Sequence, residues 1–533
     1  MRFRLPCLLA LLATAVAAAE PAPKPLDLPK FVVTGREVVE LPPFTVTGMS
    51  LGNNWRYASI PGFEIISQCH DSESVAIVEA IIRGRQLMLA PEFWTDFSVP
   101  MTVVLFDQPP VSSGQPASFG SVQGPGETGR HWVNLIKRTL DDRESFALNL
   151  WPGSFEYSST FRFHTRTLFR RRAPPVPAWL NEGLMGAYGI YREGVYWFEA
   201  SRTKLLIESN WHSREVIDAV KAANRQHAAV VADRSRWGEP SPLLPFLAEL
   251  PALFESDPPT IDDPGVARWA CTAALFARWG IYGRKKPEQA AQFWRFADRA
   301  SREPVTESLF RECFGMSYAE VRAELAWYLV VAMTKQEIAE ARLPRPPKIK
   351  FRDATNVEVA RVRGEWERME SMALSAQFPE LAESARIQAT ATLNRAFNAG
   401  NRDPRLLASL GLLALDAGNY ELAHTRLEAA VAGRVAGPRV YLEVARLRWA
   451  QAMTDDQGTI PPDVLAGVIN LLMIAEQQGP PMPAVYLLLA QAAAQAKLVT
   501  PAQADALRRG LAFFPRLPDL KEQIDAALDP SIR

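Results

Sequence analysis

The sequence predicts an α+β domain, with a small mixed sheet and a mostly helical second half, followed by an α-solenoid of paired helices. Three observations lead to this fold class. The 533 residues exceed what one hydrophobic core serves, so several units are expected. Strand and helix patterns alternate early in the chain and then give way to helical periodicity. Beyond residue 355 the chain repeats itself with a period of about 34 residues.

The composition is that of a globular protein and narrows the classes of partner. Apolar residues make up 48% of the chain and charged residues 22%, which excludes a mostly disordered or collagen-like protein. Basic and acidic residues number 59 each, so no net field favours nucleic acid as a partner. The six histidines are few for this length, which limits metal chemistry.

Residues 1–19 have the pattern of a secretory signal peptide. Arg2 and Arg4 give a basic start, residues 5–16 are apolar, and the alanines at 17–19 supply small side chains for a signal peptidase. The apolar run is shorter than the roughly 20 residues of a membrane-spanning helix. The sequence therefore predicts an exported protein, periplasmic or extracellular, without a transmembrane segment.

Residues 20–53 form a Pro-rich segment that contains an internal repeat. Residues 31–35 and 44–48 both have the sequence Phe-x-Val-Thr-Gly. Short β-prone stretches between Pro and Gly can add a strand to the sheet edge of another protein. The same composition also suits a flexible linker, which we expect here.

Residues 54–200 are predicted to form the α+β domain. Strand patterns occupy residues 62–69, 101–106 and 146–150, and an amphipathic helix pattern occupies residues 74–89. A helical run begins at residue 154 and ends before Pro174, because proline cannot continue a helix.

Residues 201–341 are predicted to be a helical continuation of this domain. Apolar residues recur with helical spacing over residues 203–222, 267–279 and 318–333. A basic, Pro-rich stretch at residues 342–354 then predicts a linker between domains.

Residues 355–533 carry a sequence repeat. Leu407, Leu410 and Gly411 open its clearest copy, which continues through Gly418, Tyr420, Ala423, Leu427 and Ala430. The next copy opens at Tyr441, and Ala389, Leu393 and Ala396 stand one period before Ala423, Leu427 and Ala430. This spacing resembles the tetratricopeptide repeat, in which small residues let paired helices approach closely. We expect about three and a half repeats, the last opening at Tyr486, with about 11 extra residues in the loop at 454–462.

Three cysteines follow the signal peptide: Cys69, Cys271 and Cys313. An oxidising compartment permits one disulfide, but the spacing does not choose the pair. The alternative is that all three are small buried apolar side chains. No C-x-x-C pattern occurs, which excludes a zinc ribbon.

Residues 177–184, Pro-Ala-Trp-Leu-Asn-Glu-Gly-Leu, resemble the third-ligand motif of gluzincin zinc metallopeptidases. The resemblance implies that Glu182 stands at the third zinc ligand. It also implies an upstream H-E-x-x-H helix, whose two imidazoles face one side of the helix and bind zinc while its Glu acts as general base. The resemblance covers residues 54–334, including the Phe-Gly-Met-Ser turn at 314–317.

The positions of that upstream helix are degenerate. His164 precedes Glu182 at close to the family's spacing for the second His. This register places Thr160 at the first His and Phe161 at the general base. Two protein ligands without a base do not support the usual zinc mechanism. No catalytic residue, metal or cofactor is therefore expected.

No other histidine restores the site. Taking His164 as the first His would put Thr165 at the base and Leu168 at the second ligand. The other five histidines have no His at i+4: His70, His131, His212, His227 and His424. Zinc held by His164 and Glu182, with a distant ligand such as His131 or His212, remains the alternative.

Helical geometry predicts what replaces the metal. At about 100° per residue, His164 lies on the same side of its helix as Thr160 and Phe161, and Arg162, Arg166 and Arg170 form a solvated row on the opposite side. We expect His164 to donate a hydrogen bond to Glu182. A separation beyond roughly 6 Å would contradict this, because it is about twice hydrogen-bond reach.

These features together predict an exported, non-catalytic protein that binds polypeptides through a retired peptidase cleft and tetratricopeptide-like repeats. The alternative is an active secreted zinc metallopeptidase with a non-standard ligand set.

Overall fold

The structure is a computed structural model, and the residues that it describes lie within Leu51–Arg533. Among them, no helix combines the length and apolar character needed to cross a membrane. The predicted signal peptide and the repeated phrases at 31–35 and 44–48 lie outside the described residues. The described residues are 55–88, 93, 99–105, 121–125, 132–136, 139–141, 146–150, 165, 168–187, 190–192, 195–198, 218–226, 241–255, 265–283, 287–332, 336–339, 345–375, 378–454, 460–497 and 499–529.

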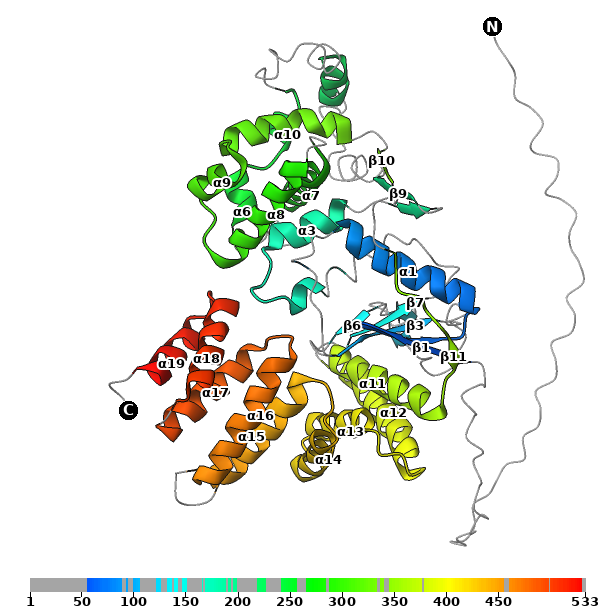
Figure 1. The fold of residues 1–533 in the computed structure, drawn as a ribbon. Coiled ribbons are helices and arrows are strands. Elements are labelled where there is room, and N and C mark those ends of the chain that lie inside the picture. The colour runs from blue at the N-terminus through cyan, green and yellow to red at the C-terminus, as the bar shows by residue number, and fades with distance from the viewer. Residues whose placement is uncertain are drawn as a thin grey trace, which may run out of the picture. The chain divides into compact units, whose positions relative to one another are not determined.

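The first structural unit is a mixed six-stranded sheet with the order β11-β1-β2-β3-β7-β6 (Figure 1). The neighbours β2, β3 and β7 are parallel, and the outer strands β1, β6 and β11 pair antiparallel. The strands predicted at 62–69, 101–106 and 146–150 are confirmed. The six strands are β1 (Arg56–Ile60), β2 (Phe63–Ser67), β3 (Met101–Leu105), β6 (Thr139–Asp141), β7 (Phe146–Leu150) and β11 (Arg352–Asp353).

Both faces of the sheet are covered by helices. Side chains alternate along a strand, so Ile65 and Val103 pack on the side of α1 (Asp71–Met88), whereas Ile66 and Val104 pack against α11 (Asn356–Leu374). Figure 1 shows these two helices on opposite sides of the sheet. Burial on both faces explains why β3 is almost continuously apolar, whereas β2 is equally buried but also carries Glu64 and Ser67.

The end of the predicted linker belongs to the sheet. β11 pairs with β1 through Arg56 opposite Asp353, and Ile349 is buried in the core under α1. The helix α11 follows directly. It begins at a capping box in which Thr355 and Glu358 satisfy each other's backbone N–H groups. The α+β domain and the helical repeats therefore share one continuous core at this point.

A helical lobe follows the sheet strands in sequence. Its core is aromatic, and the helices predicted at 267–279 and 318–333 are confirmed. The elements are α3 (Ala178–Ala187), η4 (Leu244–Phe246), α6 (Leu250–Phe254), α7 (Val266–Arg278), η5 (Trp279–Gly283), α8 (Pro287–Arg302), α9 (Glu307–Phe314) and α10 (Tyr318–Ala332), with a further helical segment at 218–226.

The turn at 314–317 stops one helix and starts the next. Gly315 ends α9 in the left-handed conformation, with φ of 70°, which glycine adopts without strain. Ser317 then caps α10, because its hydroxyl accepts a hydrogen bond from the backbone N–H of Glu320 at 3.2 Å, and the Glu320 carboxylate accepts from the Ser317 backbone N–H at 2.7 Å. Local helix chemistry accounts for this part of the family resemblance.

The expectation of almost wholly helical structure across 201–341 is incomplete. A three-stranded sheet of order β10-β9-β8 brings Gln336–Ala339 beside two strands that precede the helices. The first two strands are rich in β-branched and aromatic residues, which favour strands. This sheet comprises β8 (Ile190–Arg192), β9 (Val195–Phe198) and β10 (Gln336–Ala339), and a separate hairpin comprises β4 (Ser121–Pro125) and β5 (Trp132–Ile136).

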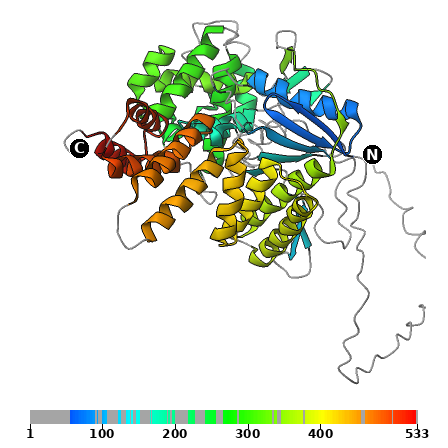
Figure 2. The ribbon, with the colours of Figure 1, turned by 60° about the horizontal axis from the view of Figure 1, so that its bottom comes forward.

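The C-terminal third is an α-solenoid of tetratricopeptide-like helix pairs, with nine helices among the described residues. Successive helices lie side by side in Figures 1 and 2. Seven of the nine begin with proline, whose fixed φ and missing N–H suit the first helical position. The remaining helices after α11 are α12 (Pro379–Asn398), α13 (Pro404–Asp416), α14 (Tyr420–Ala432), α15 (Pro438–Thr454), α16 (Pro462–Gln478), α17 (Pro483–Ala496), α18 (Pro501–Phe513) and α19 (Pro518–Leu528).

The predicted small-residue packing is confirmed between α13 and α14. A Cβ atom on Gly411 would lie 2.6 Å from Leu427, whose side chain is fully buried.

The extra residues of the next repeat are distributed more widely than predicted. Only four of them extend the loop between α15 and α16. Most of the others lengthen the helices, since α15 and α16 have 17 residues each, whereas α13 and α14 have 13 each.

Cys69, Cys271 and Cys313 are all buried. Cys69 lies in the core under α1, whereas Cys271 and Cys313 lie in the core of the helical lobe. The structure thus favours the apolar alternative over a disulfide. Burial also raises the pKa of the Cys271 thiol to about 12, so it stays protonated.

Candidate functional site

The motif helix α3 is built into the aromatic core of the helical lobe. Trp179 is fully buried, and its ring centre lies 5.4 Å from those of Phe254 and Phe276 and 5.6 Å from that of Phe296. Leu180 also has no exposed surface. The apolar half of the motif therefore has a packing role that needs no metal.

Gly183 brings α3 close to α7. A Cβ atom at this position would lie 2.6 Å from the carbonyl oxygen of Ala273, and one on Gly186 would lie 2.6 Å from the Cβ atom of Ala274. Glycine is thus required at 183 by helix packing.

Helix packing explains Trp179 and Gly183 of the motif, but it does not explain the charged group of Glu182. Its side chain is half-buried, and the nearby Asn181 donates a long hydrogen bond of 3.5 Å to its Oε1 atom. No three His, Cys, Asp or Glu side chains in the described part of the chain could together hold a metal ion.

Thr160, Phe161 and His164 lie outside the described residues, so the hydrogen bond between His164 and Glu182 stays a prediction. Of the predicted arginine row, Arg170 is exposed as expected, and Arg162 and Arg166 also lie outside.

A cavity of about 1010 Å³ opens at the N-terminal end of α3, and its described lining does not include Glu182. Six chain segments line it: residues 170–178, 251–255, 300–307, 318, 480–483 and 514–517. The helical lobe supplies the first four and the loops of the last repeats supply the others. Its volume lies at the upper end of the range for ligand sites, so it can take a ligand as large as a short peptide.

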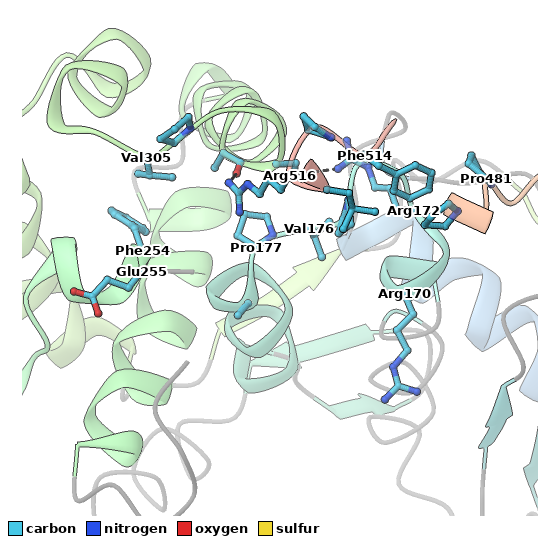
Figure 3. Close-up of a pocket in the computed structure, with 18 of the residues that line it drawn as sticks. Arg170, Arg172, Val176, Pro177, Phe254, Glu255, Val305, Pro481, Phe514 and Arg516 are labelled. Atoms are coloured by element: carbon cyan, nitrogen blue, oxygen red, sulfur yellow. Dashed lines mark hydrogen bonds between the residues drawn. The ribbon is translucent and has the colours of Figure 1, made fainter. Parts of the chain in front are cut away.

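Proline and aromatic residues make up 11 of the 25 residues that line the cavity. Phe254, Tyr318 and Phe514 supply the rings, and Figure 3 shows Phe254 and Phe514 on opposite sides of Val176 and Pro177. Proline has no N–H and a fixed φ, so these walls are rigid and poor in hydrogen-bond donors. Eight prolines contribute: Pro175, Pro177, Pro251, Pro304, Pro480, Pro481, Pro483 and Pro515.

Two arginines of the lining hold the cavity together. Buried Arg172 donates to Asp298 at 2.7 Å and to Ser301 at 3.2 Å. Burial alone would raise the pKa of Asp298, but hydrogen bonds from Arg302 and Arg172 keep it below its usual value. Arg516, in the loop before α19, donates to the backbone oxygen of Ala300 at 2.9 Å (Figure 3). Both arginines are already partnered, so they shape the cavity.

Tyr318 and Arg170 are two of the polar groups of the lining that could meet a ligand. Burial and the nearby Glu307 raise the pKa of Tyr318 to about 12, so its hydroxyl remains a hydrogen-bond donor at neutral pH. The exposed Arg170 extends away from Phe254 and Glu255 in Figure 3, which places charge at the edge of the cavity.

A second polar cluster lies between the sheet and the repeats. Glu64 of β2 is 1% exposed and forms ion pairs with Arg361 of α11 and Arg405 of α13, the latter at 3.0 Å. Tyr57 and Thr102 donate to the same carboxylate at 3.0 and 3.3 Å. Burial would raise the pKa of Glu64, but the two arginines outweigh it and lower that pKa to about 2. Because both carboxylate oxygens are fully paired, the cluster joins two structural units and leaves no group free for chemistry.

Comparison with known proteins adds little to this picture. No family model matches the chain, and no curated protein matches it. Among solved structures, the chain is similar to a crystal structure of the APC/C hetero-tetramer Cut9-Hcn1. The identity is 11%, the match covers 71% of this chain and 78% of that one, and the TM-score is 0.22. At this TM-score, neither the fold nor the function is inferred from the similarity.

The sequence did not reveal the cavity. Its lining runs from Arg170 to Leu517 in widely separated segments, and no local pattern links them. The available signals were the Pro-Pro pair at 174–175, which indicated only the end of a helix, and a second Pro-Pro pair at 480–481, from which no prediction was made.

Proposed function

We propose that the protein is an exported, non-catalytic scaffold that holds an extended, apolar segment of a polypeptide in the cavity at the start of α3. The observation that carries this proposal is the wall of prolines and aromatic rings around a space of about 1010 Å³. Aromatic-lined grooves of this kind suit proline-rich polypeptides in the polyproline II conformation, because proline has no backbone N–H group that needs a partner.

The wall also argues against the addition of a β-strand. Strand addition needs a free row of backbone N–H and C=O groups on the receiving protein. Here eight of the lining residues are prolines, which lack the N–H group, and no β-strand contributes to the described lining. Binding would therefore rest on apolar burial, with the Tyr318 hydroxyl and proline carbonyl groups as polar contacts.

The cavity is pre-organised, which favours binding. Arg516 ties the last repeats to the end of α8 through the backbone oxygens of Ala300 and Glu303. Ala173, from the segment that leads into the cavity, packs against the core of the repeats. A site that is already formed loses less conformational entropy when a ligand binds.

The resemblance to gluzincins fits this proposal as a retired catalytic domain. The packing of Trp179 and Gly183 gives the motif a structural role that does not depend on zinc. We propose that Glu182 faces His164 rather than a metal ion.

The mature protein is expected to contain no stoichiometric zinc and to leave unfolded casein uncleaved. The physical reason is the absence of the first His ligand and of the general base from the sequence. Elemental analysis of the purified protein and casein digestion with and without a chelator check this. Tight zinc together with chelator-sensitive cleavage would instead identify an active metallopeptidase.

A Met482→Glu substitution is expected to weaken binding of a fluorescent decaproline probe at least tenfold. Met482 is half-buried in the cavity wall, and a carboxylate there would have to lose its hydration when a ligand binds. Met453→Glu is the matched control, because Met453 is 45% exposed at the end of α15 and lies outside the lining.

Fluorescence anisotropy distinguishes the outcomes. Equal binding by the wild type and both variants would place the probe elsewhere, and absence of binding to all three would reject a polyproline-type site. Loss in Met482→Glu alone supports the proposal.

A further inference from the structure

Two arginines enclose the ring of Phe397 on the repeat surface. The central guanidinium carbon of Arg402 lies 3.7 Å from the ring centre, and that of Arg426 lies 3.5 Å from it. Two guanidinium groups cannot occupy one face of a phenyl ring at such distances, so they stack on opposite faces. The ring comes from the end of α12, Arg402 from the following turn, and Arg426 from α14.

The two arginines differ in how their donors are used. Arg402 donates to the backbone oxygens of Phe397 and Asn401 at 2.7 and 2.8 Å, so it caps the end of α12. Arg426 makes no hydrogen bond or ion pair within the part of the chain that the structure describes. Its side chain is half-buried, and burial together with the charge of Arg402 lowers its pKa. A cation is thus held beside another cation without a counterion from the described residues.

The acidic residues close to these arginines in sequence already have other partners. The acid nearest in sequence, Asp403, accepts from the backbone N–H of Arg405 at 2.8 Å and caps α13. Glu428 on α14 pairs with Arg448 at 2.6 Å. No described carboxylate therefore forms an ion pair with Arg402 or Arg426.

We propose that Arg402 and Arg426 form a binding site for a carboxylate group of a partner polypeptide, separate from the proline-lined cavity. Guanidinium groups present planar sets of donors that match the two oxygens of a carboxylate. Phe397 fixes the spacing of the two cations, since its ring packs against the repeat core. The open donors of Arg426 supply the new hydrogen bonds, and Arg402 adds charge from a fixed position.

Titration with a fluorescent hexaglutamate peptide tests this on the full-length protein. We expect the wild type to bind the peptide and Arg426→Met to bind it at least tenfold more weakly. Arg395→Met is the matched control, because Arg395 is exposed on α12 and contacts neither Phe397 nor an acid in the described structure. Hexaglutamine, which has the same length without the charge, should not bind.

Two further measurements distinguish a carboxylate-binding site from a purely structural role of Arg426 and from a site that binds any anion. Without peptide, Arg426→Met should leave Tm unchanged or raise it, because methionine keeps the apolar contact with the ring and removes the repulsion. A clear fall in Tm, or equal peptide binding by Arg426→Met, would overturn the proposal. Displacement of the peptide by an equal concentration of inorganic phosphate would overturn the assignment to a carboxylate.

Discussion

Replacing Glu64 with alanine is expected to lower the free energy of unfolding by about 3–5 kcal/mol. The substitution leaves the buried guanidinium group of Arg361 and the adjoining Arg405 without their carboxylate, and an unpaired buried charge is costly. It also removes the acceptor of the Tyr57 hydroxyl. Urea unfolding followed by tryptophan fluorescence measures the effect, because Trp366 is fully buried in the core beside this cluster.

Glu383→Ala is the matched control for that substitution. Glu383 also pairs with an arginine, Arg386, but its side chain is 51% exposed. An exposed pair contributes at most about 1 kcal/mol. Equal effects of the two substitutions would show that burial of Glu64 is not what makes its ion pairs important.

The same carboxylate makes stability depend on pH in a defined window. The pKa of Glu64 is lowered from 4.5 to about 2, so its contribution is complete above pH 4.5. The contribution is lost as the pH falls from about 4.5 toward 2, because the unfolded chain takes up the proton first. The shift corresponds to about 3 kcal/mol. The stability difference between wild type and Glu64→Ala should therefore shrink over that range and stay constant from pH 5 to 8.

Because of the Glu64 cluster, deletion of the repeats is not a suitable test of their binding function. Removing residues 355–533 would uncover Ile66 and Val104, which pack against α11, and would leave Glu64 without its arginines. Loss of partner binding by such a truncated chain would report unfolding as much as a missing surface. Single substitutions such as Met482→Glu and Arg426→Met avoid this, since each lies outside that junction.

Elements with a local periodic signal were predictable from the sequence. The helix over Asp71–Met88 and the strand over Met101–Leu105 follow from apolar spacing within a few residues. The helix pairs follow from small and large residues that recur about every 34 positions.

Features that depend on distant partners were not predictable. The two arginines that pair with Glu64 follow it by 297 and 341 residues, so a charged residue in an apolar strand gave no indication of its partners. The strand β11 is two residues long, within a stretch whose prolines indicated a linker. Its place in the sheet depends on β1, which lies at the start of the described part of the chain.

Substitutions in the motif helix separate its packing role from its chemistry. Trp179→Ala is expected to lower the free energy of unfolding by about 3–5 kcal/mol, because it empties the centre of an aromatic cluster. Gly183→Ala should cost about 1–3 kcal/mol, because the added methyl group meets the backbone of α7. Urea unfolding followed by circular dichroism measures both effects.

Glu182→Gln is the informative contrast, because it keeps the shape of the side chain and removes the charge. In a retired site its effect on stability should be limited to the loss of one half-buried charge, about 1 kcal/mol or less, with the zinc content unchanged at zero. A metal ligand would behave differently, since its loss would release bound zinc and lower Tm by more than the packing change explains. A large loss of stability in Trp179→Ala with a small one in Glu182→Gln would show that the motif has a structural role in the core. The reverse order would restore the chemical interpretation of the motif and contradict a non-catalytic function.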